Sequence, residues 1–415
     1  MHWINFNRYT LKELTGTSQS PFAALSTLLP TECAKIDCLT GKYVASVQVG
    51  IPTGVAESYA EYRPTRLQEL SRFAKSLGFP GRIFCKREDL NPTGSHKLNC
   101  ALAEAYFAAK QGVEEIVVHT GAGQWGLAIA FACHRLGLKA TVFMTRSSHV
   151  DKRERVDLMR MLGADVVPSP SDRTATGRLR ITDHPGGSLD VALSEAVEWC
   201  RDHPNARIGQ GCLSYHASLF QSIIGAELVE QFSAIGIKPD VLVAPAGGGT
   251  NFLGFVSGYL EQRKEARTPR LLAAEAAEVP VLTSGQLLLE SPDWAGHLPP
   301  SLVYSLGKSK CLPQIEANGL RSNTKSAVLS LLKRDGVVES VAVDQDSALT
   351  AALMLYENEG ILAAPESAIA IGAVAQLIRS NDLTAANTIG VNISGSGLLD
   401  VRSYERKVSS PAQGR

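Results

Sequence analysis

Residues 86–99 of this chain read KREDLNPTGSHKLN, and this stretch decides how the rest of the sequence is interpreted. Four charged residues and a Pro-Thr-Gly turn lead into a His-Lys pair, which stands directly before an apolar pattern with helical spacing. Lys97 is therefore expected in the first turn of a helix, where the helix dipole disfavours its positive charge. The same effect lowers the pKa of the amine, as a Schiff-base lysine requires. A solvated surface lysine is the alternative, and this stretch alone leaves both open.

A second motif, residues 247–251 (GGGTN), follows the apolar run 241–245. Three successive glycines let backbone amides approach one point, and the positive end of the following helix favours an anion there. The lysine of a nucleotide-binding P-loop is missing, so the motif predicts a phosphate site that does not take a nucleoside triphosphate. A purely structural turn is the alternative.

A third motif, residues 121–126 (GAGQWG), follows the expected strand 115–119 and has the formal G-x-G-x-x-G spacing of a dinucleotide site. Such a site places an acidic residue about 20 residues further on, but Thr145 and Arg146 stand there. An NADP site with Arg146 on the 2′-phosphate, or a glycine turn that serves only close packing, are both open on this evidence.

Around these motifs, short β-branched runs alternate with longer helical patterns. Strands are expected at residues 83–86, 115–119, 140–144, 165–168, 241–245 and 388–393. This alternation is typical of an α/β protein with parallel sheets flanked by helices. Residues 168–187 contain three prolines and three glycines, and we expect them to form a long loop of the kind that closes a site.

The composition excludes several classes of function. The chain has 415 residues with 41 Lys+Arg and 41 Asp+Glu, so neither a nucleic-acid surface nor an acidic disordered tail is expected. No apolar run reaches the roughly 20 residues of a membrane span, and residues 1–11 lack a signal-peptide pattern, so we expect a cytoplasmic protein without a membrane partner. The eight cysteines form no C-x-x-C pair and have no histidine at zinc spacing, which predicts free thiols and no metal site.

Taken together, the three motifs resemble the pyridoxal-phosphate (PLP) enzymes of fold type II, and within them the tryptophan synthase β chains of the stand-alone second form. The likeness runs from about Ile51 to Asp400. It implies two interleaved α/β domains with PLP in the cleft between them. The implied segments are an N-terminal extension (1–62), an N-terminal α/β domain with a mobile closing segment (97–215), a C-terminal domain that binds the PLP phosphate (63–96 and 216–400) and a tail (401–415).

The resemblance also implies roles for single residues, with Lys97 as the amine that bonds to the cofactor aldehyde. The other residues implied to hold PLP are His96, Asn99, Gly247, Gly248, Gly249, Thr250, Asn251, Glu366 and Ser394. The residues implied to bind the substrate carboxylate are Thr120, Gly121, Ala122, Gly123 and Gln124, which explains the glycine spacing without a dinucleotide. A hydroxyl such as that of Ser394 at the pyridine nitrogen leaves the ring a weak electron sink, which favours loss of a β-leaving group to an aminoacrylate.

One residue departs from the family pattern. The family has a glutamate before T-G-A-G-Q that handles protons at Cβ, and this chain has His119. An imidazole, with an ordinary pKa of about 6.5, serves as acid or base, and its protonated form favours an anion. We therefore expect a catalytic His119 to adapt the site to another leaving group or nucleophile, such as an O-phospho or O-acyl serine or an acidic nucleophile. Residues 322–323 (SN) also replace the Tyr-His that the family has after residues 318–321.

These features predict β-elimination and β-replacement on L-serine or another β-substituted amino acid, with a nucleophilic co-substrate. The alternatives are elimination alone, as in an amino-acid dehydratase or deaminase, and the condensation of serine with indole itself. An NADP oxidoreductase would leave Lys97 without a role, and a non-catalytic protein of the same fold would explain the lost glutamate. The resemblance implies a homodimer and argues against an α-type partner subunit.

Overall fold

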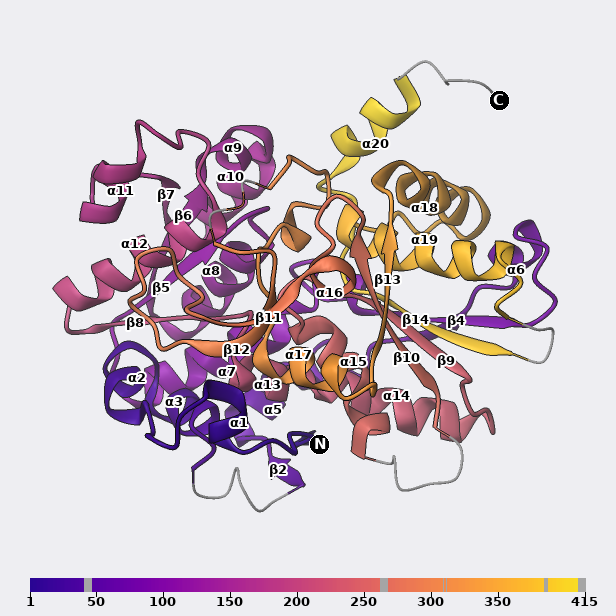
Figure 1. Cartoon of the computed structure of the whole chain (residues 1–415), viewed down its shortest axis with the longest axis horizontal. Helices are drawn as coiled ribbons and strands as arrows, with labels where there is room; N and C mark the ends of the chain where they lie inside the picture. The colour runs from indigo at the N-terminus through magenta and orange to yellow at the C-terminus, as the bar shows by residue number, and fades with distance from the viewer. Residues whose placement is uncertain (41–46, 262–267, 309, 311, 384–386, 410–415) are drawn as a thin grey trace.

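Two sheets dominate the described part of the chain, and helices cover both of them (Figure 1). The computed structural model describes residues 1–40, 47–261, 268–308, 310, 312–383 and 387–409. The strands of the smaller sheet lie within residues 115–208, and those of the larger sheet come before and after this segment. The two α/β units are thus interleaved along the chain, which confirms the predicted fold class. The domain boundaries given above stay predictions.

The smaller sheet has the strand order β7-β6-β5-β8, and its neighbouring strands run parallel. Its strands are β5 (Glu115–Thr120), β6 (Lys139–Thr145), β7 (Asp165–Ser169) and β8 (Ala206–Ile208). The helices of this unit are α7 (Lys97–Lys110), α8 (Gln124–Leu136), α9 (Arg146–Asp151), α10 (Arg153–Met161), α11 (Ala175–Arg180) and α12 (Leu189–Asp202). Because the strands are parallel, the loops at their carboxyl ends gather at one edge of the sheet.

The larger sheet has the strand order β13-β10-β9-β14-β4-β3, in which only β3 runs antiparallel among the described strands. Its strands are β3 (Leu67–Glu69), β4 (Arg82–Arg87), β9 (Val241–Pro245), β10 (Arg270–Ala276), β13 (Glu339–Val343) and β14 (Thr388–Ile393). Leu242 and Ala244 pack in one hydrophobic cluster, and Val241 and Val243 pack in the other. Successive side chains of a strand point to opposite faces, so this sheet is buried on both sides.

Helices of the larger unit form these two layers. Helix α15 (Thr250–Glu261) belongs to the first cluster, and helix α19 (Pro365–Arg379) belongs to the second. The other helices of this unit are α6 (Ser71–Ser76), α13 (Tyr215–Gln221), α14 (Ile223–Ala234), α16 (Val281–Ser284), α17 (Ala327–Arg334), α18 (Gln345–Glu359) and α20 (Val401–Ser409). A hairpin of β11 (Gln286–Glu290) and β12 (Ser301–Ser305) and two short 3-10 turns, η1 (Glu88–Leu90) and η2 (Asn318–Leu320), complete it.

The N-terminal segment packs on the core. Trp3 is 1% exposed, and its ring centre lies 4.6 Å from that of Phe220. The elements of this segment are β1 (His2–Ile4), α1 (Leu11–Thr15), α2 (Phe22–Leu28), α3 (Thr31–Asp37), β2 (Gln48–Gly50) and α5 (Thr53–Ala60).

The structure confirms the six expected strands and the helix that starts at Lys97, and it corrects other expectations. Residues 168–187 are not all loop, because Thr174 caps the helix α11 by accepting a hydrogen bond from the Gly177 amide. Strand β10 was missed because its sequence, RLLAAEA, is rich in residues that favour helices. The expected tail contains helix α20, whose Tyr404 hydroxyl donates to the Ala363 carbonyl (2.6 Å), while residues 410–415 lie outside the described residues. In the part of the chain described here, none of the helices is long and apolar enough to cross a bilayer.

Candidate active site

A pocket of about 380 Å³ lies where the loops at the carboxyl ends of β5 and β9 meet the start of α7. This is the edge at which open α/β sheets bind their ligands. The predicted site residues that line it are Lys97, His119, Thr120, Gly121, Ala122, Gln124 and Gly248. Residues far apart in the sequence are therefore brought together as the motifs suggested.

Lys97 is the first residue of α7 and is held by polar neighbours. Its Nζ donates to Gln124 Oε1 (3.0 Å) and lies 3.4 Å from His96 Nε2. Gln124 Nε2 in turn donates to Glu366 Oε2 (3.1 Å), and Glu366 Oε1 accepts from the Gly319 amide (2.8 Å). Burial lowers the pKa of the Lys97 amine, against the opposing charge of Glu366. The amine is thus easier to deprotonate than an exposed lysine, as a nucleophile requires.

The glycine loop before α15 packs too closely against its neighbours to carry side chains at its glycines. A Cβ on Gly247 would lie 2.8 Å from the Gly319 carbonyl oxygen, and Gly249 has φ +112°, which favours glycine. The side chains of the two following residues hold the loop: Asn251 Nδ2 donates to the Pro245 carbonyl (3.1 Å), and Thr250 Oγ1 donates to the Gly211 carbonyl (3.3 Å). The backbone amides at the start of α15 then remain as the donors for an anion.

His96 adds a further donor or acceptor next to Lys97. Its side chain is buried, and its Nδ1 has no hydrogen-bond partner among the described residues. Burial and the neighbouring charge of Lys97 lower the pKa of His96 well below its ordinary value. An amine, an unpartnered imidazole nitrogen and an unhindered glycine loop at a helix N-terminus fit the aldehyde and phosphate of PLP.

Ser394 and Asn99, two further residues predicted to contact PLP, differ in their surroundings. Ser394 lies beside His96, whose backbone amide donates to the Ser394 carbonyl (2.9 Å), and its Oγ is 2.8 Å from Ser367 Oγ. Asn99 is fully buried and does not line the pocket. Its Oδ1 accepts from Tyr62 and Arg63. Asn99 is therefore held by other buried side chains, and its place beside the cofactor ring stays a prediction.

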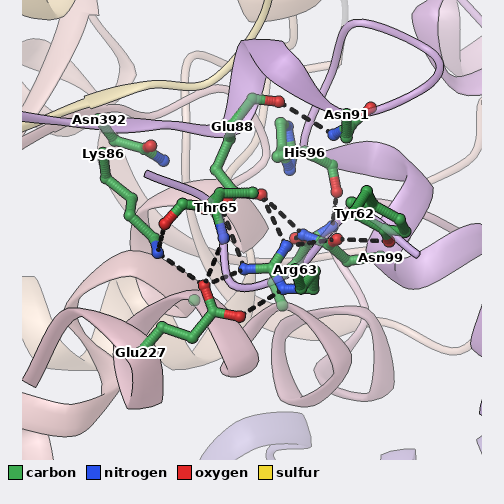
Figure 2. Close-up of polar contacts among 12 residues, drawn as sticks. Tyr62, Arg63, Thr65, Lys86, Glu88, Asn91, His96, Asn99, Glu227 and Asn392 are labelled. Atoms are coloured by element: carbon green, nitrogen blue, oxygen red, sulfur yellow. Dashed lines mark hydrogen bonds and ion pairs between the residues drawn. The ribbon is translucent and has the colours of Figure 1, made fainter. Parts of the chain in front are cut away.

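Asn99 belongs to a buried polar cluster beneath the start of α7 (Figure 2). Arg63 donates to both carboxylate oxygens of Glu88 and of Glu227, at 2.8 to 3.0 Å. Lys86 Nζ also donates to Glu227 (2.6 Å). Two cations and two anions balance in this cluster, which ties α5, β4 and α14 to the helix that carries Lys97.

The loop predicted to bind the substrate carboxylate forms the N-terminal turn before α8. Gly123 has φ +89°, which favours glycine and turns the loop into the helix. Arg155 supports this loop from behind, because its NH1 donates to the Ala122 carbonyl (3.2 Å). Asp400 holds Arg155 in place through a 2.6 Å ion pair. The amides at this helix start and the charge of Arg155 together favour a carboxylate.

His119 is 3% exposed and lines the pocket. Its Nε2 lies 3.9 Å from Cys212 Sγ, and within the described chain its buried Nδ1 has no hydrogen-bond partner. Burial lowers the pKa of His119 to about 4, so the imidazole is neutral at pH 7. Of the two roles that the sequence leaves open for His119, acid and base, a neutral imidazole fits the base. Burial also raises the pKa of Cys212 to about 11, so this neighbour is a neutral thiol.

The structure adds pocket residues that the sequence did not indicate. They are Arg180, Cys212, Trp294 and Lys308, and Asn323, from the altered pair 322–323, lines the pocket as well. Arg180 lies in the predicted closing segment, which was the one sequence signal that pointed to its region. Trp294 lies between β11 and β12, and its contact with Arg180 depends on how the hairpin folds over the smaller unit.

Comparisons with known proteins show the family of this chain. The family model described as pyridoxal-phosphate dependent enzyme matches residues 59–395. The tryptophan synthase beta chain of Pyrobaculum islandicum is 42% identical over 393 residues, which cover 94% of this chain and 91% of that protein. The tryptophan synthase beta chain 2 of Thermotoga maritima is 39% identical over 359 residues, covering 86% of this chain and 85% of the relative. The processed form of threonine deaminase isoform 2 from Solanum lycopersicum has a similar fold, with a TM-score of 0.62, 17% identity and coverage of 86% and 89%.

Proposed function

Because the chain belongs to the pyridoxal-phosphate-dependent enzymes, as a tryptophan synthase β-like member, we propose that it replaces the β-substituent of an amino acid with a second, nucleophilic substrate. The observation that carries this proposal is the common pocket of Lys97, His119 and the loop of residues 120–124. PLP, when bound, withdraws electrons from the Cα of the amino acid, which makes the α-proton acidic and the β-substituent able to leave.

The residues of this chain bind the substrate and the cofactor and move the protons. The amides of residues 120–124 bind the substrate carboxylate and fix Cα beside Lys97. The Lys97 amine, with its pKa lowered by burial, bonds to the cofactor and moves the proton at Cα. When PLP is bound, the backbone amides of residues 247–251 and the His96 ring would hold its phosphate, and Ser394 would contact its pyridine ring.

His119 acts on the nucleophile. Its neutral imidazole accepts the proton of the nucleophile while the lone pair of the nucleophile forms the new bond to Cβ. The leaving group departs with the electron pair of its own bond to Cβ, so the exchange needs no oxidant or reductant. A glutamate would repel an anionic nucleophile at this point, and a neutral imidazole does not.

Replacement is favoured over elimination alone by the extent of the pocket. Beyond His119 the pocket continues to Arg180 and Trp294, which leaves room for a second substrate. An enzyme that only eliminates needs no such room. The alternative that remains is a dehydratase or deaminase that uses the same Lys97 and carboxylate loop.

The test uses the protein loaded with PLP and L-serine, O-acetyl-L-serine or O-phospho-L-serine, with and without indole or a small thiol. Mass spectrometry of the products is expected to show an amino acid that carries the added nucleophile. Pyruvate and ammonia at the same rate with every nucleophile would establish the elimination-only alternative. Efficient condensation of serine with indole would contradict the altered specificity that we attribute to His119.

We also propose that the enzyme works as a cytoplasmic homodimer without an α-type partner subunit. The seven cysteines in the described residues are free thiols, which is typical of a reducing compartment. Some of the similar proteins are second-form β chains. Sedimentation of the purified chain together with its activity in the absence of other proteins tests both points.

A further inference from the structure

We propose that the nucleophilic substrate carries an anionic group, a carboxylate or a phosphate, and that Arg180 binds this group beside Trp294. This inference rests on the proposed function and names the class of its second substrate. In the proposed function, the carboxylate of the amino-acid substrate binds residues 120–124. A second anion-binding group in the same pocket is therefore available for an anionic group on the second substrate.

Arg180 is the last residue of α11 and lines the pocket. Its guanidinium carbon lies 4.9 Å from the ring centre of Trp294, which fixes the plane of the group. The Nε atom of Arg180 is buried, and none of the described residues accepts its hydrogen. Buried donors usually have a partner in the protein, in ordered water or in a ligand, and because Arg180 lines the pocket its N–H is available to a bound ligand.

The charge of Arg180 is only weakly compensated. Asp183 Oδ2 lies 3.6 Å from Arg180 NH1, but the Asp183 side chain is 68% exposed. Ion pairs of this kind contribute little in water, because both groups stay solvated. A guanidinium offers several donors in one plane, which matches the two oxygens of a carboxylate or phosphate.

The surrounding lining has an excess of positive charge. Lys308 Nζ donates to the backbone carbonyl of Asp293 (2.9 Å), which carries no charge to neutralise the ammonium. Apart from Lys97, the charged side chains of the described lining are Arg180, Lys308, Lys310 and Arg321 against Asp183 and Asp190. A pocket with more basic than acidic groups attracts an anionic substrate and disfavours a cationic one.

Two further unpartnered atoms line the same pocket. Asn323 Oδ1 and His119 Nδ1 are both buried, and the described part of the chain offers neither of them a hydrogen-bond partner. Asn323 Oδ1 accepts hydrogen bonds only, so it suits an N–H or O–H of the ligand. We therefore expect a nucleophile with an anionic group at one end, which binds Arg180. Its other end carries a proton and meets Asn323 or His119.

The closing experiment compares two thiols that differ in charge, mercaptoacetate and 2-mercaptoethanol, with O-acetyl-L-serine as the amino-acid donor and the PLP-loaded enzyme. We expect kcat/KM for mercaptoacetate to exceed that for 2-mercaptoethanol by about 10-fold, which corresponds to about 1.4 kcal/mol. Arg180→Gln is expected to raise the KM for mercaptoacetate by a similar factor and to affect the reaction of 2-mercaptoethanol much less. Arg180→Lys is expected to restore part of the preference. Equal use of both thiols by the unmodified enzyme, or equal effects of Arg180→Gln on both, would overturn the inference.

A binding measurement separates this inference from the proposed function. Mercaptoacetate is expected to change the tryptophan fluorescence of the PLP-loaded enzyme, and Arg180→Gln or Trp294→Phe is expected to remove this change. The measurement needs no turnover, so it holds even if replacement does not occur. A change produced equally by 2-mercaptoethanol would contradict the inference.

A third experiment tests whether the anion that Arg180 binds belongs to the nucleophile or to the leaving group. If the anion that Arg180 binds belongs to the leaving group, Arg180→Gln will impair O-phospho-L-serine more than O-acetyl-L-serine and will leave the thiol preference intact. That result would overturn the assignment to the nucleophile. An effect on mercaptoacetate that is the same with both donors supports it.

Discussion

The buried cluster around Arg63 and the outer end of the pocket around Arg180 each hold a guanidinium, but they differ in how its donors are satisfied. The Arg63 side chain is fully buried, and that of Arg180 is 22% exposed. Arg63 makes five hydrogen bonds, to Glu88, Asn99 and Glu227. Arg180 Nε has no acceptor within the described chain, and the acidic neighbour of Arg180 is mostly exposed. The first arrangement is complete without a ligand, and the second is not.

This difference separates the constant part of the site from the variable part. The Arg63 cluster supports the helix start that carries Lys97, and the chemistry of Lys97 is the same for every amino-acid substrate. The groups near Arg180 line the end of the pocket where we propose that the second substrate binds, and we call them the variable part. A polar group that stays unpaired in a folded protein stabilises nothing by itself, so its presence is best explained by a ligand.

The largest loss of activity is expected from a substitution of Lys97, which lines the pocket. Lys97→Ala removes the amine that bonds to PLP and moves the α-proton, so replacement activity is expected to fall by about 1,000-fold or more. The visible absorbance of the bound cofactor is expected to change with it. Lys110→Ala, at the exposed end of the same helix, serves as the control and is expected to keep full activity. A Lys97→Ala protein with nearly normal activity would refute the assigned role.

The role of the buried cluster around Arg63 can be tested by removing the charge of Arg63. Arg63→Met leaves Glu88 and Glu227 buried without their main partner, which is expected to lower the free energy of unfolding by about 3 to 5 kcal/mol. The exposed pair Arg153–Asp157 gives the control, since Arg153→Met is expected to cost about 1 kcal/mol or less. Urea unfolding measures both. Equal losses in the two variants would contradict the contrast between buried and exposed pairs.

The same cluster predicts how stability depends on pH. Burial alone would raise the pKa of Glu88, but the charge and hydrogen bonds of Arg63 lower it to about 2. Because this folded-state pKa is lower than the ordinary value of about 4.5, the contribution of ionised Glu88 is complete above pH 4.5 and is lost towards pH 2. Arg63→Met is therefore expected to weaken this part of the acid dependence.

His119 is expected to give a smaller effect than Lys97, because only the step at Cβ depends on it. His119→Gln is expected to lower kcat by about 100-fold and to remove the acidic limb of the pH profile near pH 4, where the neutral base becomes protonated. The exposed His134→Gln is the matched control. His119→Glu, which restores the residue of the family pattern, is expected to favour neutral over anionic nucleophiles. An unchanged pH profile in His119→Gln would rule out the proposed base.

The constant part of the site could be predicted from the sequence, because its signals are local. The stretch before Lys97 and the two glycine motifs each combine turn residues with the start of a helix, and the structure brings their residues into one pocket. The hydrogen-bond partners of Asn99 and Thr250 could not be predicted. Their partners come from distant elements, so the sequence could not show that they hold other parts of the protein.

The groups around Arg180, the variable part, could not be predicted either, because their contacts also join distant elements. Arg180 and Trp294 meet only because a hairpin after β10 folds over the segment that contains α11. The sequence also left open whether His119 acts as an acid or a base, since the ordinary pKa of histidine gives no information about burial. The burial that lowers this pKa comes from the surrounding pocket and depends on the complete fold.

The smallest predicted effect concerns Asp183, at the end of the pocket that contains Arg180. Asp183 competes with an anionic ligand for Arg180, and because the pair is exposed its removal is expected to gain only about 0.5 kcal/mol. Asp183→Asn should therefore lower the KM for mercaptoacetate by roughly twofold and leave the KM for 2-mercaptoethanol unchanged. Added salt should reduce the difference, because exposed charges are screened. A higher KM for mercaptoacetate would mean instead that Asp183 holds Arg180 in place, and the open end of the pocket would then depend on an ion pair just as the cluster around Arg63 does.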